Sequence, residues 1–527
     1  MQKPLLTGTF VAVGAALALP AAPASADVCG TADMDTVAEI TDCVTLDALV
    51  GHLEAWQQIA DENGGTRVSG LPGYDLSVAY VAEQLEAVGY EVTLQSFPFN
   101  AFINLGGSRL AQKTAPDPTF YEEGVDFSLL SQTDPGKTYA PVTAVDLDLG
   151  RGNESTSGCE PEDYEGFPAG HIALVQRGAC TFQLKAENAA AVGATGVVIF
   201  NQGNSPDRRD LINATLSNEY SGGIPVVFTT YQLGREFSRT EDLELRLKTD
   251  VFRGETQTEN VIAELPGENP GNVVTVGAHL DSVEEGPGIQ DNGTGSAAVL
   301  ETAIQMAGAT YPNTVRFLWW GAEESGLVGS EYYVDQLSEE EIAEIALYLN
   351  FDMIGSPNWV YGIYDGDDSD LFGEGPGPEG SAQIEAAFEE YFTSIGVPFQ
   401  GTDFSGRSDY GPFIAVGIPA GGLFTGAEGI KTEEEEAIFG GTAGEPYDPT
   451  YHTPGDTIDS VAFEPLDVNS DAVAAVTLRY ALDTQEVNGI GDGGLALVAS
   501  VSASAEGGAK AVAGSGGFEM LGNHYVR

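Results

Sequence analysis

The chain has 527 residues, of which 42% are hydrophobic, so it can form a sizeable core and more than one domain of ordinary size. Its 21 basic and 80 acidic residues give a formal net charge of −59 at pH 7. Such a chain repels phosphate backbones, so we expect no nucleic-acid partner. Salt would screen the repulsion among its own acidic residues, which suggests a protein adapted to salty surroundings.

The N-terminal residues have the pattern of a secretory signal peptide. Lys3 precedes an apolar run over residues 5–19, and Ala24-Ser25-Ala26 offers the small residues of a cleavage site. A membrane anchor is the alternative, but the run is short and no positively charged flank follows it. We therefore expect residues 1–26 to be removed, no membrane association, and a secreted, extracellular mature chain.

The four cysteines form two pairs that are close in sequence, Cys29 with Cys43 and Cys159 with Cys180. An extracellular location would allow each pair to close as a disulfide. The two other pairings remain open at this point. No Cys-x-x-Cys spacing is present, so we expect no thiolate zinc site.

The first half of the chain predicts two kinds of structure. Apolar residues recur at helical spacing over residues 45–60 and 76–88, and residues 91–99 alternate like a strand. Residues 131–254 then contain short β-type runs around one helical segment, residues 182–192. This change of character indicates a separate, small α+β domain.

From residue 255 to residue 487, predicted strands alternate with predicted helices. The expected buried strands and then the expected helices are residues 261–265, 273–278, 315–320 and 346–351, and residues 295–307 and 383–391. This alternation predicts a three-layer α/β domain with a mostly parallel sheet. Residues 27–130 would complete this domain, which the small α+β domain interrupts, and residues 488–527 form a flexible tail rich in Gly, Ala and Ser.

Side chains that can bind metal follow the predicted strands of the α/β domain. They are His279, Asp291, Glu324, Asp352 and, in a later loop, His452. Each has an ordinary alternative as a cap or surface residue, but only five histidines occur in the chain and two of them are in this set. Strand ends in such a sheet meet at one edge, so we expect the side chains to converge. Five nitrogen and oxygen ligands exceed the needs of one zinc ion, which predicts two zinc ions sharing a carboxylate.

The sequence around these residues resembles that of secreted di-zinc aminopeptidases, the group of leucyl aminopeptidase and aminopeptidase Y. The similarity covers nearly all of residues 45–485. Its strings are HLDS from His279, GIQDNGTG from Gly288, GAEE from Gly321, NFDM from Asn350, and Tyr451-His452. The resemblance implies an enzyme that hydrolyses the N-terminal residue from peptides or proteins.

The resemblance also implies a role for each candidate ligand. Asp291 would bridge the two zinc ions. His279 and Asp352 would complete one metal site, and Glu324 and His452 would complete the other.

Four further residues receive expected roles. The resemblance makes Glu323 the general base and Tyr451 a donor to the tetrahedral oxyanion. Asp281, two residues from His279, could accept the imidazole N–H and fix its tautomer, unless it is a turn residue. Arg407 lies in a segment that shapes the substrate pocket in the family, so it either contacts substrate or forms a structural ion pair.

The small α+β domain resembles a protease-associated domain, most clearly over residues 175–182 and 194–200. Such domains interrupt the peptidase domain in several members of the family and are thought to influence access of the substrate. A role as a spacer is the alternative.

Two other functions keep the same fold. A carboxypeptidase of the glutamate carboxypeptidase type would need cations for a free carboxylate, and Arg407 is the single basic residue in a pocket-like motif. A non-catalytic, receptor-like homologue would typically have lost ligands, whereas all five ligands and the base are present here. The sequence leaves the oligomeric state open, with a monomer favoured.

Overall fold

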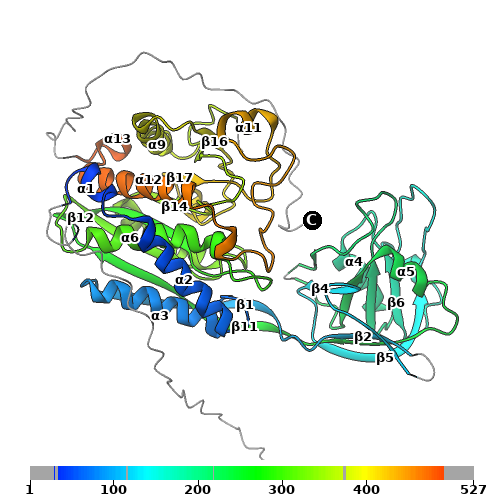
Figure 1. The fold of residues 1–527 in the computed structure, drawn as a ribbon. Helices are drawn as coiled ribbons and strands as arrows, with labels where there is room; N and C mark the ends of the chain where they lie inside the picture. Colours follow the sequence, from blue (N-terminus) through cyan, green and yellow to red (C-terminus); the bar gives the residue numbers. More distant parts are fainter. Residues whose placement is uncertain (1–28, 30–33, 114–116, 218, 372–374, 492–527) are drawn as a thin grey trace, which may run out of the picture.

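The computed structural model describes residues 29, 34–113, 117–217, 219–371 and 375–491. They form a larger α/β body and a smaller body, joined by a two-stranded ribbon (Figure 1). The predicted signal peptide and almost all of the predicted tail lie outside the described residues. Within the described residues, no helix has the length and apolar character needed to cross a membrane.

The larger body is built on an eight-stranded sheet. In sheet order its strands are β1 (Val92–Asn104), β11 (Val251–Leu265), β13 (Asn313–Trp320), β12 (Asn269–His279), β14 (Ile345–Phe351), β17 (Ala420–Phe424), β15 (Gly362–Tyr364) and β16 (Gln400–Thr402). The four central strands, from β13 to β17, are parallel. Antiparallel pairings join β1 to β11, β11 to β13, and β15 to β17. The expected parallel sheet is therefore confirmed at the centre, with antiparallel pairings toward both edges.

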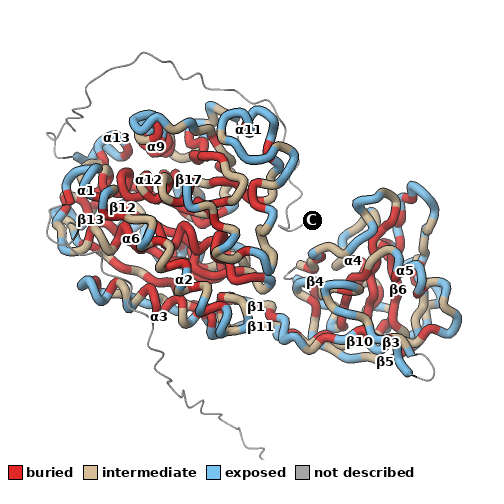
Figure 2. Tube along the Cα trace, viewed as in Figure 1, coloured by how far each residue is buried: buried red, intermediate tan, exposed pale blue. Residues whose placement is uncertain are grey.

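Helices cover both faces of this sheet, which explains why its central strands are apolar on both sides. In β13, Phe317 and Trp319 face one apolar core, whereas Leu318 and Trp320 face the other. Figure 2 shows the resulting buried centre. The helices of the first face are α1 (Val37–Thr41), α2 (Leu46–Glu62), α3 (Pro72–Ala87), α6 (Thr294–Met306), α9 (Ser381–Ile395) and α12 (Phe463–Leu482). Those of the second face are α7 (Val328–Gln336) and α10 (Tyr410–Ala415).

The smaller body is an insertion carried by the antiparallel pair β1 and β11. Its nine strands, in sheet order, are β3 (Thr119–Tyr121), β2 (Arg109–Gln112), β10 (Glu244–Thr249), β5 (Gly136–Ala144), β6 (Ile172–Gln176), β7 (Gly196–Phe200), β9 (Val226–Thr229), β4 (Phe127–Ser131) and β8 (Ala214–Thr215). The helices α4 (Phe182–Ala191) and α5 (Tyr231–Phe237) pack in different apolar cores of this body.

The sheet of the insertion begins earlier in the chain than the expected boundary at residue 131. It includes β2 and β3, which lie wholly before that residue, and most of β4. These strands have three to five residues each, which is too few for a clear alternating pattern.

Both expected disulfides are present. Cys29 is bonded to Cys43 and Cys159 to Cys180, with Cα–Cα distances of 5.5 Å and 5.7 Å. The first fixes residue 29 beside the end of α1, and the second closes a loop within the insertion.

Candidate active site

The five candidate ligands converge at the carboxyl edge of the large sheet. His279 ends β12, and Asp352 directly follows β14. Asp291 lies in the short π-helical turn η2 (Ile289–Gly293), and Glu324 in the loop after β13. With His452 they form two groups of three whose ligand atoms lie within 4.8 Å of one another: His279 with Asp291 and Asp352, and Asp291 with Glu324 and His452.

Asp291 belongs to both groups and lies between the two histidines. Its Oδ1 atom is 3.2 Å from Nε2 of His279, and its Oδ2 atom is 3.1 Å from Nε2 of His452. Oε2 of Glu324 is 3.1 Å from the same His452 nitrogen. The other Glu324 oxygen is buried without a hydrogen-bond partner among the described residues. Imidazole and carboxylate groups gathered in this way fit zinc, and Asp291 is placed as a shared carboxylate would be.

Asp352 is held by a residue whose role the sequence did not reveal. Its Oδ1 atom is 3.3 Å from Nε2 of His279, while Ser408 donates a hydrogen bond to Oδ2 at 2.7 Å. Asn350 in turn donates to the Ser408 hydroxyl at 2.9 Å. The hydroxyl therefore occupies one carboxylate oxygen and leaves the other facing His279. Ser408 lies in the segment expected to shape the substrate pocket, but nothing in its spacing indicated this contact.

Asp281 contacts both His279 and Glu323. Nδ1 of His279 is 3.2 Å from the backbone oxygen of Asp281 and 3.8 Å from its carboxylate, so the nearer acceptor is the carbonyl. Either acceptor favours a proton on Nδ1 and leaves Nε2 available to a cation. The carboxylate of Asp281 also accepts a hydrogen bond of 3.2 Å from the backbone N–H of Glu323.

The loop that carries Asp291 is anchored by two residues absent from the expected set. Asp456 accepts hydrogen bonds from the backbone N–H groups of Gln290 and Asp291, at 2.7 Å and 3.1 Å. Arg67 is fully buried, and its guanidinium donates to the backbone oxygens of Leu280, Pro287 and Gly288. It thus ties the loop after His279 to the loop before Asp291. Arg67 is far from every ligand in sequence, and Asp456, although it lies close after His452, contacts a segment 165 residues earlier in the chain, so no local pattern could reveal either contact.

The backbone is strained next to several of the ligands. Ala322, Met353 and His452 have φ angles of 55°, 52° and 53°, in the left-handed region that non-glycine residues rarely adopt. Such conformations cluster at functional sites, where the surrounding structure maintains them. Here they occur just before Glu323, just after Asp352, and at His452 itself.

Burial and crowding shift the pKa values of the acidic side chains. Burial raises the pKa of Glu323 well above its ordinary value, and the nearby Asp409 and Glu324 carboxylates add to this although His279 opposes it. Burial also raises the pKa of Glu324 to about 7. Burial alone would raise the pKa of Asp291, but the hydrogen bonds to His279 and His452 outweigh it, so the pKa lies below its ordinary value. A bound divalent cation would stabilise the ionised form of each of these carboxylates, so the site is electrostatically suited to a divalent cation.

Tyr451 and Arg407 border the ligands. The Tyr451 ring stacks on that of His452, with centroids 3.8 Å apart. Burial raises the pKa of the Tyr451 hydroxyl well above its ordinary value, so the hydroxyl remains a donor at neutral pH. Arg407 lies 3.9 Å from Glu428.

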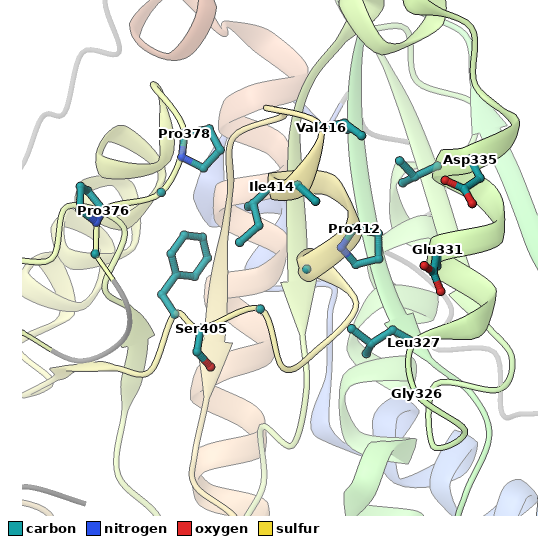
Figure 3. A pocket seen from close by; sticks show the side chains of 17 residues that line it. Gly326, Leu327, Glu331, Asp335, Pro376, Pro378, Ser405, Pro412, Ile414 and Val416 are labelled. Carbon is teal, nitrogen blue, oxygen red and sulfur yellow. The ribbon is translucent and has the colours of Figure 1, made fainter. Parts of the chain in front are cut away.

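A separate pocket of about 900 Å³ lies beside these loops, between α7 and α10 (Figure 3). Its lining includes Leu327, which is close in sequence to Glu324, and Ser405, which is close in sequence to Ser408. None of its lining residues is a candidate ligand, so it is distinct from the metal-binding groups.

Comparisons with known proteins identify the family. The model of peptidase family M28 matches residues 260–477, and that of the PA domain matches residues 133–237. An aminopeptidase of Pseudomonas aeruginosa strain UCBPP-PA14 is 54% identical over 446 residues, which cover 85% of this chain and 83% of the relative. The chain belongs to peptidase family M28. The expected family, with an inserted protease-associated domain, is therefore confirmed.

Other relatives and solved structures that are similar to this chain are also named aminopeptidases. A probable lipoprotein aminopeptidase of Mycobacterium tuberculosis is 40% identical, covering 88% of this chain and 90% of the relative. The aminopeptidase from Aneurinibacillus sp. strain AM-1 is 27% identical with a TM-score of 0.59, covering 84% of this chain and 95% of that one. A zinc aminopeptidase from Bacillus subtilis, 23% identical with a TM-score of 0.60, covers 88% of this chain and 99% of its own and shares the fold.

Proposed function

We propose that this M28 peptidase is a secreted aminopeptidase that uses two zinc ions to remove N-terminal residues from peptides or proteins. The observation that carries the proposal is the position of Asp291, whose two oxygens face different histidines at 3.2 Å and 3.1 Å. The relatives from Pseudomonas aeruginosa and Mycobacterium tuberculosis are both named aminopeptidases. The two disulfides are compatible with secretion.

In this proposal His279 and Asp352 hold one zinc ion, Glu324 and His452 hold the other, and Asp291 contacts both. The ions, when bound, would supply a water of lowered pKa and would polarise the scissile carbonyl. Glu323 would take a proton from the attacking water and transfer it to the leaving amine. Its position supports this role, because its carboxylate lies within 4.8 Å of the ligand atoms of His279 and Glu324.

Tyr451 would donate a hydrogen bond to the oxyanion that develops as water attacks the carbonyl. Its stacking on His452 supports this role, because it keeps the phenol beside a proposed zinc ligand. Asp281 would orient both His279 and the backbone of Glu323, with which it is in contact.

The carboxypeptidase alternative requires a cation for the free carboxylate of a substrate. Arg407 is the candidate, but its guanidinium lies 3.9 Å from the Glu428 carboxylate. That ion pair disfavours recognition of a second carboxylate. The non-catalytic alternative is disfavoured because the ligand set and Glu323 lie together.

Hydrolysis of amino-acid anilides, compared with N-blocked peptides, tests the proposed activity. We expect hydrolysis of leucine anilide and of free-amino peptides, and none of N-acetylated peptides. Release of C-terminal residues from N-blocked peptides would support the carboxypeptidase, and inactivity on all substrates by zinc-loaded protein would support the receptor-like homologue.

Metal analysis tests the number of zinc ions. We expect about two zinc ions per active chain, because five ligands with one shared carboxylate suit a paired site. A strong chelator should abolish activity and zinc should restore it. Full activity with a single bound metal ion would disprove the paired site.

A further inference from the structure

The insertion carries most of the positive charge of this acidic protein. Thirteen of the 21 basic residues of the chain fall between residues 105 and 255. Five of them share the outer side of the strands β3, β2, β10 and β5, which we call the basic face. They are Arg109, Lys113, Lys137, Arg246 and Lys248.

Strand register places these side chains in rows across the sheet. Lys248 pairs with Arg109 on one neighbouring strand and with Lys137 on the other, so three cations lie side by side. The next row on the same side contains Arg246, next to Tyr139. Directly opposed like charges destabilise a sheet, so this arrangement has an energetic cost.

Only part of this positive charge is neutralised within the protein. Lys113 forms an ion pair with Glu244, and Lys248 lies 2.6 Å from Asp250. Arg109, Lys137 and Arg246 are exposed and form no ion pair with any described residue. The basic face therefore retains positive charge in a chain whose net charge is −59.

Two aromatic rings lie on the same face. Phe120 is 65% exposed and Tyr139 is 56% exposed. Phe120 pairs with Ala111 and Ala111 with Arg246, so the two rings occupy the ends of a single row. At ~4.8 Å between strands, their Cα atoms are about 14 Å apart, with Arg246 on a strand between them. The Tyr139 hydroxyl donates a hydrogen bond to Glu244 at 2.9 Å, and the Lys113 ammonium lies 5.8 Å from the centroid of its ring. Exposed aromatic residues beside cations are typical of binding surfaces.

We propose that the basic face binds an acidic polysaccharide. The cations would bind the carboxylates of its uronic acids, and Phe120 and Tyr139 would pack on the C–H faces of its sugar rings. This combination of flat apolar rings and spaced carboxylates matches exposed aromatic side chains that share a face with unpaired cations. The binding goes beyond the proposed function and does not depend on it, because no residue of the basic face belongs to the catalytic set.

Other anionic partners fit less well. Duplex DNA carries one charge per ~1.7 Å, so the net charge of −59 repels it more strongly than it repels a polyuronate of sparser charge. A second copy of this chain brings another −59, which opposes association. An acidic polypeptide supplies carboxylates but has no sugar rings to cover Phe120 and Tyr139.

Binding of the purified full-length chain to immobilised polygalacturonate tests the proposal, with dextran as the neutral comparison. We expect binding to polygalacturonate and none to dextran. Replacing two of the three unpaired cations, in Lys137→Gln/Arg246→Gln, should weaken binding at least about tenfold, because contacts to charged groups are lost. Phe120→Ala/Tyr139→Ala should also weaken it. Hydrolysis of leucine anilide and the thermal midpoint should stay at the wild-type level in both variants.

The variant Arg235→Gln/Arg239→Gln is a matched control. It removes two exposed cations from the same insertion but outside the basic face, and should change binding less than about twofold. An equal loss in this control, or no binding by the wild type, would overturn the proposal. Binding to poly-L-glutamate or duplex DNA as tight as binding to polygalacturonate would also overturn it, in favour of another anionic partner.

Discussion

Glu323 and Glu324 are adjacent and chemically identical, but their surroundings predict different mutant phenotypes. Glu323→Gln keeps the side-chain shape and removes the proton acceptor, so turnover should fall by ~10²–10⁴-fold with little change in KM. Both zinc ions should remain bound. Glu324→Gln replaces the carboxylate that lies 3.1 Å from His452, so it should lower the zinc content, because an amide is a poorer zinc ligand. Zinc content and kcat, measured on the same preparations, check both expectations.

Glu331→Gln provides the control for this pair, since Glu331 is an exposed glutamate on α7. It should keep wild-type turnover and zinc content. A zinc-replete Glu323→Gln protein with near-normal turnover would rule out Glu323 as the base.

Arg67 makes a second prediction at the residue scale. Burial lowers its pKa to about 10, and the carboxylates of Asp456, Asp281 and Asp291 oppose this shift, so it remains charged at neutral pH. A lysine ammonium cannot reproduce the fork that reaches three carbonyls. We expect Arg67→Lys to lower the free energy of unfolding by about 2–4 kcal/mol, measured by urea denaturation of the zinc-free protein.

The control for Arg67 is Arg479→Lys, which changes a partly exposed arginine paired with Glu390 and Glu486. Its effect should stay below about 1 kcal/mol. An Arg67→Lys protein as stable as the wild type would show that the three carbonyl contacts contribute little.

The sequence predicts the candidate ligands better than the residues that hold them. His279 and Asp352 were recognisable because each ends or follows an apolar strand, and strand ends of a parallel sheet share an edge. Ser408, Asp456 and Arg67 act through contacts between segments distant in sequence, which no local period encodes. The positions of the ligands could therefore be expected, whereas their orientation could not.

At the scale of elements, prediction succeeded where a segment is long or wholly buried. The limits of the buried strands β12 and β14 and of the helix α6 differ from the expected ones by at most four residues. The antiparallel edge pairings could not be expected, because alternation with helices indicates parallel neighbours only. The short strands of the insertion were missed because three to five residues carry no clear period.

The packing of α6 against β14 makes a prediction about Gly295. A Cβ atom at this position would overlap the backbone oxygen of Phe351, the residue before Asp352. Gly295→Ala should therefore push the helix away from the strand and separate Asp291 from Asp352. We expect a loss of at least about 2 kcal/mol in stability, measured by urea denaturation, together with weaker zinc retention.

Gly51→Ala is the matched control, because Gly51 also lies in a helix, α2, but has open space around its Cβ position. There the substitution should raise stability by about 0.5–1 kcal/mol, since alanine favours helix. If Gly295→Ala were equally stabilising, close contact between α6 and β14 would not determine the site geometry.

At the scale of the whole molecule, the two bodies differ in charge. Thirteen basic residues lie between residues 105 and 255, so the remainder of the chain has only eight to offset its acids. Within the described part of that remainder, Arg67 is fully buried, and Arg316 and Arg479 form ion pairs. The larger body therefore carries most of the unbalanced negative charge.

This imbalance predicts that folding depends on salt. Added salt shortens the Debye length from about 30 Å at 0.01 M to about 3 Å at 1 M, which screens repulsion between surface carboxylates. With zinc held constant, the thermal midpoint should rise with NaCl, most steeply below a few tenths molar, where screening changes fastest. Sodium sulfate at equal ionic strength should match NaCl in that range, because screening depends on ionic strength, whereas preferential exclusion of sulfate acts at higher concentration. A thermal midpoint that stays constant or falls as NaCl is raised would refute salt adaptation. A rise with sulfate alone would show that the effect comes from exclusion of sulfate from the protein surface.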